Sequence, residues 1–122
     1  MPQAIVVDDD VASAELMSIV LERAGYSVVT ITSGHAALIE IPQRQPDVVI
    51  INDNMPGISG GETCRLLKLR DDTAHIPILI SSAGIQIRNP VYLKEIGADG
   101  TIPKPCLPRD IIQIVEKVTA RN

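Results

Sequence analysis

The stretch Pro46–Gly60, "PDVVIINDNMPGISG", joins a continuous apolar run to a polar loop that holds one acid between two amides. A β-branched run without polar alternation is typical of a strand buried on both faces of a parallel sheet. The Pro and Gly that follow are typical turn residues. The stretch therefore predicts a buried strand whose carboxyl end carries Asn52, Asp53 and Asn54.

Similar apolar runs recur along the chain and alternate with segments of helical period. The other predicted strands are "QAIVV" at 3–7, "SVVTI" at 27–31, "IPILIS" at 76–81 and the weaker "DGTIP" at 99–103. Helices are predicted up to a stop at Gly25, from Ser33, over 60–72, over 89–98 and from Pro108. Alternating strands and helices favour an α/β fold, with helices on both faces of a doubly wound parallel sheet. We expect one compact (βα)5 domain over residues 1–122.

Composition and charge exclude several classes of function. The net charge is −4, the 11 Lys and Arg residues form no run, and Phe and Trp are absent, so we expect no nucleic-acid binding by this domain. No apolar run reaches the ~20 residues that span a bilayer, so no membrane segment is expected. The two cysteines have neither metal nor redox spacing, which indicates free thiols and a cytoplasmic location.

Polar residues follow the predicted strands where ligands of such sheets bind, beyond the carboxyl ends. They are Asp8, Asp9 and Asp10 after the first strand, Asn52 after the third, Ser81 and Ser82 in the fourth, and Lys104 after the fifth. Neighbouring carboxylates repel, so such a cluster usually holds a cation or a neighbouring lysine. Asp8 and Asp9 are expected to bind Mg²⁺, which accepts one or two carboxylates. For Asp10 we favour a helix cap.

Four blocks resemble, in order, the signatures of the receiver domain of two-component response regulators: "IVVDDD", "PDVVIINDNMPGISG", "PILISSAG" and "GADGTIPKP". The resemblance implies a three-layer, CheY-like (flavodoxin-like) sheet with strand order 2-1-3-4-5. It also implies phosphorelay signalling rather than catalysis. In the family, an aspartate four residues before the turn proline takes a phosphoryl group from a histidine kinase.

Carried over by position, the resemblance assigns roles to seven residues. It implies that Asp8 and Asp9 are the metal-binding acids and that the backbone carbonyl of Asn54 joins the metal shell. Ser82 resembles the switch hydroxyl, and Lys104 the lysine that pairs with the phosphoryl oxygens. Two positions depart from the pattern: Asn52 stands where the acceptor aspartate is expected, and Thr101 stands where the family commonly has the switch aromatic.

Asn52 changes the expected chemistry because an amide carries no charge and its nitrogen has no free lone pair. Asp53 is an alternative acceptor, but neighbouring strand residues point to opposite faces, so its carboxylate is expected to face away from Asp8 and Asp9. We expect Asp53 to be a solvated loop acid or a turn-stabilising side chain. With one negative charge fewer, Mg²⁺ binding is expected to be weak.

Three classes of function remain open. The first is an atypical receiver that acts by protein contact, with Asn52 either native or an engineered change. The second is a phosphorylatable receiver that uses Asp53 or another residue. The third, more remote, is a Mg²⁺-dependent phosphatase with an aspartate nucleophile, suggested by the D-x-D spacing of Asp8 and Asp10.

The resemblance also implies protein partners. They are a histidine kinase, an output domain, or a second copy of the chain bound through the face formed by the fourth helix, fifth strand and fifth helix. Ile85, Ile87, Ile102 and Ile112 fall near this face, although most of them are expected to be ordinary packing residues. His35 and His75 stand alone among polar residues, and we interpret both as surface histidines.

Overall fold

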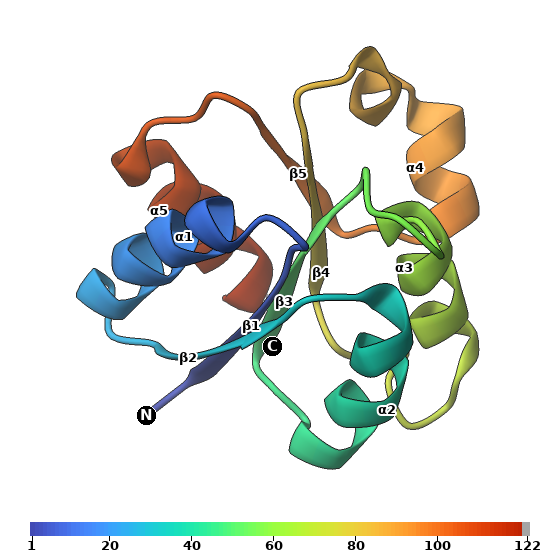
Figure 1. Ribbon diagram of the computed structural model, residues 1–122, viewed down its shortest axis with the longest axis horizontal. Helices are drawn as coiled ribbons and strands as arrows, with labels where there is room; N and C mark the ends of the chain where they lie inside the picture. The colour runs from blue at the N-terminus through green and yellow to red at the C-terminus, as the bar shows by residue number, and fades with distance from the viewer. Residues whose placement is uncertain (121–122) are drawn as a thin grey trace.

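The computed structural model describes residues 1–120 and contains the predicted parallel sheet. Its strands are β1 (Gln3–Val7), β2 (Ser27–Ile31), β3 (Val48–Asn52), β4 (Ile78–Ser82) and β5 (Gly100–Pro103). All the pairings are parallel, and the order is β2-β1-β3-β4-β5. The expected fold and strand order are therefore confirmed (Figure 1).

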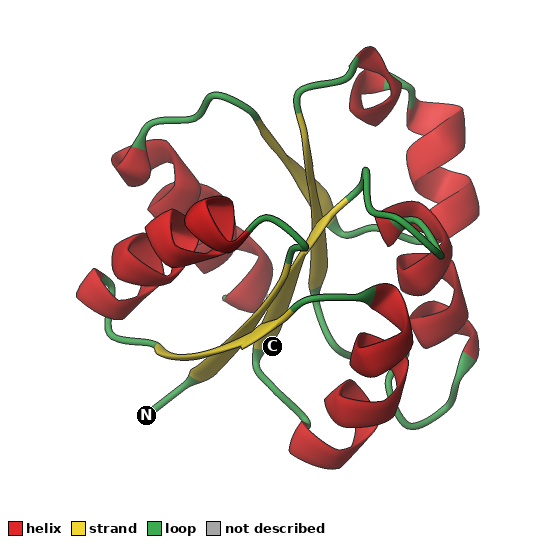
Figure 2. Ribbon diagram, in the orientation of Figure 1, coloured by secondary structure: helices red, strands yellow, loops and turns green. Residues whose placement is uncertain are grey.

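Helices cover both faces of the sheet, as Figures 1 and 2 show. The helices are α1 (Val11–Arg23), α2 (Gly34–Arg44), α3 (Gly60–Leu69), α4 (Pro90–Ile96) and α5 (Pro108–Thr119). α1 and α5 lie together on one face, and α2, α3 and α4 lie on the other. A short 3₁₀ helix, Ile85–Arg88, links β4 to α4 and was not predicted. Within residues 1–120, no helix is both long and apolar enough to cross a membrane.

Two predicted helix ends were too late in the sequence. α3 ends at Leu69 rather than at residue 72, because Arg70 is already extended at φ −91° and ψ 134°. α4 ends at Ile96 rather than at residue 98, because Gly97 takes the left-handed conformation at φ 73°. Glycine adopts that conformation without the steric cost of a Cβ, so it is a common helix stop.

The starts of α1, α2 and α3 follow from side-chain caps, whereas α5 begins at Pro108 without one. The carboxylate of Asp10 accepts hydrogen bonds from the backbone N–H groups of Ala12 and Ser13, at 3.0 and 3.3 Å. The expected capping role of Asp10 is therefore confirmed. Ser33 and Ser59 cap α2 and α3 in the same way. Each such cap contributes about 1 kcal/mol to helix stability.

Two apolar layers pack against the sheet and decide which way its end residues point. On β3, Val49 and Ile51 belong to the layer beneath α2, α3 and α4. Val48 and Ile50 belong to the layer beneath α1 and α5. Since side chains alternate along a strand, Asn52 follows Ile50 toward α1 and α5.

Candidate functional site

The side chain of Asn52 lies at the carboxyl end of β3, where it is half-buried. Its Nδ2 donates a hydrogen bond to the backbone carbonyl of Asn54 at 2.9 Å. Its Oδ1 accepts a hydrogen bond from Nζ of Lys104 at 3.2 Å. The same Nζ lies 3.7 Å from Oδ2 of Asp8, so one lysine contacts both the amide and the acid.

The acids of the first loop differ in exposure. Asp8 is 6% exposed, and its Oδ1 accepts a hydrogen bond from the backbone N–H of Asp10 at 2.9 Å. Asp9 is exposed to solvent. Among residues 1–120, no group of three or more His, Cys, Asp or Glu side chains is arranged to hold a metal ion. The backbone carbonyl of Asn54, which was expected to join the metal shell, accepts the hydrogen bond from Asn52.

A small cavity of about 20 Å³ lies beside this cluster, between the sheet and α1. Asp8, Asn52, Ser81 and Lys104 contribute to its lining. Ser81 pairs with Asn52 in the register of β3 and β4, so the two side chains share a face of the sheet. The hydroxyl oxygen of Ser81 is buried and has no hydrogen-bond partner. A buried, unsatisfied hydroxyl is uncommon and calls for an explanation.

Asp53 points to the opposite face and is nearly enclosed, at 4% exposed. Its Oδ1 accepts hydrogen bonds from the backbone N–H of Gly61 at 2.9 Å and from the hydroxyl of Tyr92 at 2.8 Å. Its Oδ2 accepts one from Nε2 of Gln86, also at 2.9 Å. The carboxylate thus connects the start of α3, the 3₁₀ helix and α4. The expectation that Asp53 faces away from Asp8 is confirmed. Of the two roles expected for Asp53, the solvated loop acid is wrong because the side chain is buried, whereas the turn-stabilising role agrees with its hydrogen bond from Gly61.

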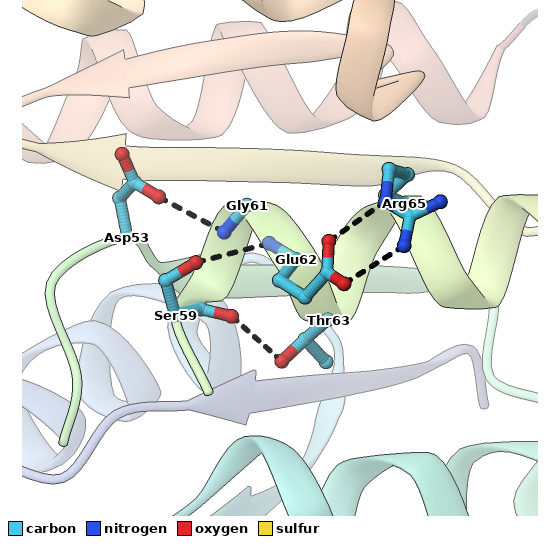
Figure 3. Close-up of polar contacts among 6 residues, drawn as sticks. All are labelled: Asp53, Ser59, Gly61, Glu62, Thr63 and Arg65. Atoms are coloured by element: carbon cyan, nitrogen blue, oxygen red, sulfur yellow. Dashed lines mark hydrogen bonds and ion pairs between the residues drawn. The ribbon is translucent and has the colours of Figure 1, made fainter. Parts of the chain in front are cut away.

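At the start of α3, the backbone N–H of Gly61 donates to this carboxylate, as Figure 3 shows. The hydroxyl of Ser59 accepts a hydrogen bond from the N–H of Glu62 at 3.1 Å, so the first N–H groups of the helix point toward Asp53 and Ser59. Negative charge is favourable near the positive end of a helix dipole. Gly61 is required for close approach, since a Cβ there would collide with the hydroxyl of Tyr92.

The pKa of the Tyr92 phenol depends on its burial and on its contact with Asp53. The pKa of this phenol is raised above its ordinary value, first by burial and second by its hydrogen bond to Asp53. The phenol therefore stays protonated and remains a hydrogen-bond donor to the carboxylate. It is the only group in this network from α4, so it fixes the position of that helix relative to the end of β3.

Ser82 belongs to the same side of the sheet as Asp53. Its hydroxyl oxygen accepts hydrogen bonds from the N–H of Gly84 at 2.9 Å and from Nε2 of Gln86 at 3.2 Å. Gln86 thus bridges Ser82 and Asp53. Thr101 is half-buried in β5, where it pairs with Ile80. Ser82 therefore contacts the β4–α4 segment. Ser81 is the hydroxyl that shares the face of Asn52 and Lys104.

Three comparisons with known proteins bear on this arrangement. A family model described as the response regulator receiver domain matches residues 4–116. The phosphate regulon transcriptional regulatory protein PhoB of Pseudomonas aeruginosa is 33% identical over 118 residues, which cover 97% of this chain and 52% of PhoB. The chain belongs to the response regulator receiver family. Members of the family are signalling domains rather than enzymes.

Solved structures agree with this assignment. The chemotaxis protein CheY4 of Vibrio cholerae superimposes on this receiver domain with a TM-score of 0.89 at 28% identity, covering 97% of this chain and 98% of that one. The receiver domain of a sensor histidine kinase from P. aeruginosa has the same fold, with a TM-score of 0.88 at 16% identity over 98% of both chains. That structure has a magnesium ion coordinated in its active site cleft. The chain spans about half the length of the curated relatives it matches.

The structure also shows the exposure of the isoleucines and histidines that the sequence pointed to. Of the four isoleucines expected near the face of α4, β5 and α5, Ile87 and Ile102 are buried at 4% and 1% exposed, Ile112 is half-buried, and Ile85 is 80% exposed. His35 and His75 are exposed, as expected. Gln86 and Tyr92 were not singled out, because nothing local in the sequence shows that both contact Asp53.

Proposed function

We propose that Asn52 occupies the phosphoacceptor position of this receiver domain, which therefore signals by protein contact without phosphorylation at that residue. The supporting observation is that Lys104 contacts both the Asn52 amide and the carboxylate of Asp8, on one face of the sheet. A carboxylate at this position would lie beside the lysine that the family uses to pair with phosphoryl oxygens. An amide there lacks the nucleophilic oxygen that forms an acyl phosphate.

Phosphorylation of Asp53 is the competing proposal, because Asp53 is the nearest acid in the sequence. Its surroundings argue against this role. Three hydrogen bonds occupy both of its oxygens, and its side chain is on the face opposite Asp8 and Lys104. A buried carboxylate would lose these bonds before it could attack a phosphodonor, at a cost of about 1–3 kcal/mol for each donor left unsatisfied.

The same geometry supports weak Mg²⁺ binding. Asp8, Asp9 and the Asn54 carbonyl supply oxygen ligands of the type that Mg²⁺ prefers. The amide of Asn52 adds no charge, and it already donates to the carbonyl of Asn54. Lys104 also provides a positive charge close to Asp8. When bound, the ion would neutralise part of the negative charge of this loop.

Partners of this receiver domain are proposed from the family. They are a histidine kinase or an output domain, and a second copy bound through α4, β5 and α5. Ile85 and Val91 support the last of these, because they are 80% and 63% exposed near that face. DNA binding is not proposed for this domain, whose net charge is −4. We place the domain in the cytoplasm, where its two cysteines would stay reduced.

Intact-mass measurement tests the proposal. Wild-type protein and Asn52→Asp are incubated with Mg²⁺ and acetyl phosphate under identical conditions. We expect Asn52→Asp to gain one phosphoryl group and wild type to gain none. Acetyl phosphate is suitable because it needs no cognate kinase.

Two results would contradict the proposal. Phosphorylation of wild type would show that another residue is the acceptor. Failure of a folded Asn52→Asp protein to react would show that the site lacks more than its nucleophile. The matched control is Asn52→Asp combined with Asp53→Asn, which is expected to react like Asn52→Asp alone.

A further inference from the structure

An apolar groove runs between α1 and the segment that leads from β5 into α5. Its volume is about 460 Å³, within the range of about 300–1,000 Å³ typical of small-molecule sites. Leu16, Met17, Ile19, Ile102 and Ile111 supply much of its apolar lining. Leu16 and Ile19 are 68% and 46% exposed, so the apolar wall formed by α1 is open to solvent.

The charged residues that line the groove are cationic, whereas its walls are apolar. Its lining includes two cationic side chains, Arg23 and Lys104. Within the part of the chain that the structure describes, no acidic residue lines it, although the whole chain has a net charge of −4. Lys104 gives one hydrogen bond to Asn52 and lies 3.7 Å from Asp8, so its ammonium group, which has three hydrogens, can donate further.

The inner end of the groove reaches the sheet. Ser81 and Lys104 line both the groove and the small cavity beside Asn52. Ser81 is only 2% exposed, and its hydroxyl oxygen has no hydrogen-bond partner. Burying a hydroxyl without a hydrogen-bond partner destabilises the protein, and a hydrogen bond to a ligand oxygen would remove this cost. An apolar groove that leads to a lysine and an unsatisfied hydroxyl has the composition of a small-molecule site.

We propose that this groove binds a small amphiphilic molecule with an apolar body and an oxyanion head group. The apolar body lies against Leu16, Met17 and Ile111. The head group pairs with Lys104 and accepts a hydrogen bond from Ser81. The bound molecule would contact the lysine of the receiver site, so it would provide an input that needs no phosphorylation of Asn52.

A small molecule fits this groove better than a partner helix. A helix is about 10–12 Å wide with its side chains, so it can cover the outer wall but not enter the sheet. The unsatisfied hydroxyl belongs to a residue that is 2% exposed, so the side chains of a helix lying on the surface do not reach it. Lys104, at the inner end of the groove, favours an anionic head group over a neutral or cationic one.

Decanoate is the probe for the test, used with the full chain and below its micelle-forming concentration. Calorimetry measures its affinity beside those of decanol and decyltrimethylammonium, which share the apolar chain. We expect saturable binding of one decanoate, and about tenfold weaker binding of decanol because the charge-assisted bond to Lys104 is lost. The cationic analogue is expected to bind more weakly still.

The cysteines provide an independent readout. Cys106 lines the groove and is half-buried, whereas Cys64 is fully buried, at 0% exposed. Burial raises the pKa of the Cys64 thiol to about 12, so it forms little thiolate and reacts slowly. Decanoate is expected to slow the alkylation of Cys106 and to leave Cys64 unchanged.

Matched variants separate groove binding from general adsorption to apolar surface. Leu16→Glu places a negative charge at the groove, and Leu69→Glu does so on α3, away from it. Both leucines are 68% exposed, so neither change should unfold the chain. We expect Leu16→Glu to weaken decanoate binding by about tenfold or more and Leu69→Glu to leave it unchanged. Lys104→Gln is expected to weaken decanoate binding but not decanol binding.

Several outcomes would overturn the proposal. These are absence of saturable binding, equal loss of affinity in both leucine variants, or equal affinity for decanoate and decanol. Sedimentation adds another: a wild-type dimer that Leu16→Glu converts to a monomer would show that the groove is an interface between two copies. The result of the Asn52→Asp phosphorylation test does not affect any of these outcomes.

Discussion

At the carboxyl end of β3, Asn52 is half-buried toward α1 and α5, whereas Asp53 is 4% exposed toward α3 and α4. Asn52 contacts one lysine and one backbone carbonyl. Asp53 receives hydrogen bonds from three different structural elements. The amide is thus beside Lys104, which we propose as the phosphoryl-pairing lysine, and the acid is enclosed in the structure of the opposite face.

The difference shows that proximity in sequence does not predict a shared role at a strand end. Two adjacent residues face opposite layers because side chains alternate along a strand. On the side of Asn52, Lys104 is partly accessible, Asp8 is about as buried as Asp53, and one hydroxyl has no partner. On the side of Asp53, both carboxylate oxygens are occupied. We therefore expect the first side to tolerate substitution and the second to depend on its acid.

The largest expected effect is on stability, from a pair of alanine substitutions. Asp53→Ala removes the acceptor of three donors and is expected to lower the free energy of unfolding by about 3–4 kcal/mol. Asn52→Ala is expected to cost about 1 kcal/mol or less, since its amide is half-buried. Urea unfolding followed by circular dichroism measures both. Equal losses for the two variants would abolish the proposed contrast.

A glycine substitution sharpens the comparison because its expected sign is unusual. Replacing glycine by alanine inside a helix ordinarily stabilises it by about 0.5–1 kcal/mol. Gly61→Ala would instead place a methyl group against the hydroxyl of Tyr92 and close to Asp53. We expect a net destabilisation of about 2 kcal/mol, as for other overpacked sites. A stabilised Gly61→Ala protein would show that the α4 contact is easily displaced.

Tyr92→Phe is expected to have a smaller effect that depends on pH. At neutral pH, loss of one hydrogen bond to Asp53 should cost about 1 kcal/mol, because the other two donors remain. The folded-state pKa of the phenol is raised, so its contribution is complete below the ordinary value near 10 and decreases as pH rises above it. The stability difference between wild type and Tyr92→Phe should therefore shrink at alkaline pH. A difference that grows with pH would contradict the proton assignment.

The smallest expected effect concerns Mg²⁺ on the side of Asn52. At an ion concentration below its Kd, a ligand stabilises a protein by less than about 0.4 kcal/mol. We expect wild type to show a thermal shift of this small size in millimolar Mg²⁺, and Asn52→Asp to show a larger one. Differential scanning fluorimetry with and without EDTA measures the shifts. A large wild-type shift that Asn52→Asp does not increase would contradict the weak-binding proposal.

Much of the fold followed from local sequence. The β-branched runs predicted the strands, and Asp10 predicted the start of α1, because strand propensity and capping depend on neighbouring residues. The opposite orientation of Asn52 and Asp53 followed from strand alternation alone. The ends predicted for α3 and α4 were too late. The backbone leaves the helical conformation at Arg70 and Gly97, before the predicted helices end.

The network around Asp53 could not be predicted in this way. Gln86 and Tyr92 are 33 and 39 residues from Asp53 in sequence, and only the packing of the 3₁₀ helix and α4 brings them to its carboxylate. Ser81 was difficult to separate from Ser82 for a related reason. Both are buried hydroxyls on β4, and the register with Asn52 decides which one shares its face.

The most direct test of the account is to locate the phosphoryl group in Asn52→Asp after reaction with acetyl phosphate and Mg²⁺. Peptide mass mapping distinguishes position 52 from Asp53 once the labile acyl phosphate is reduced or trapped. We predict that the group is on the aspartate introduced at position 52 and that Asp53 is unmodified. A phosphoryl group on Asp53, in the variant or in wild type, would contradict the division of roles between the two faces.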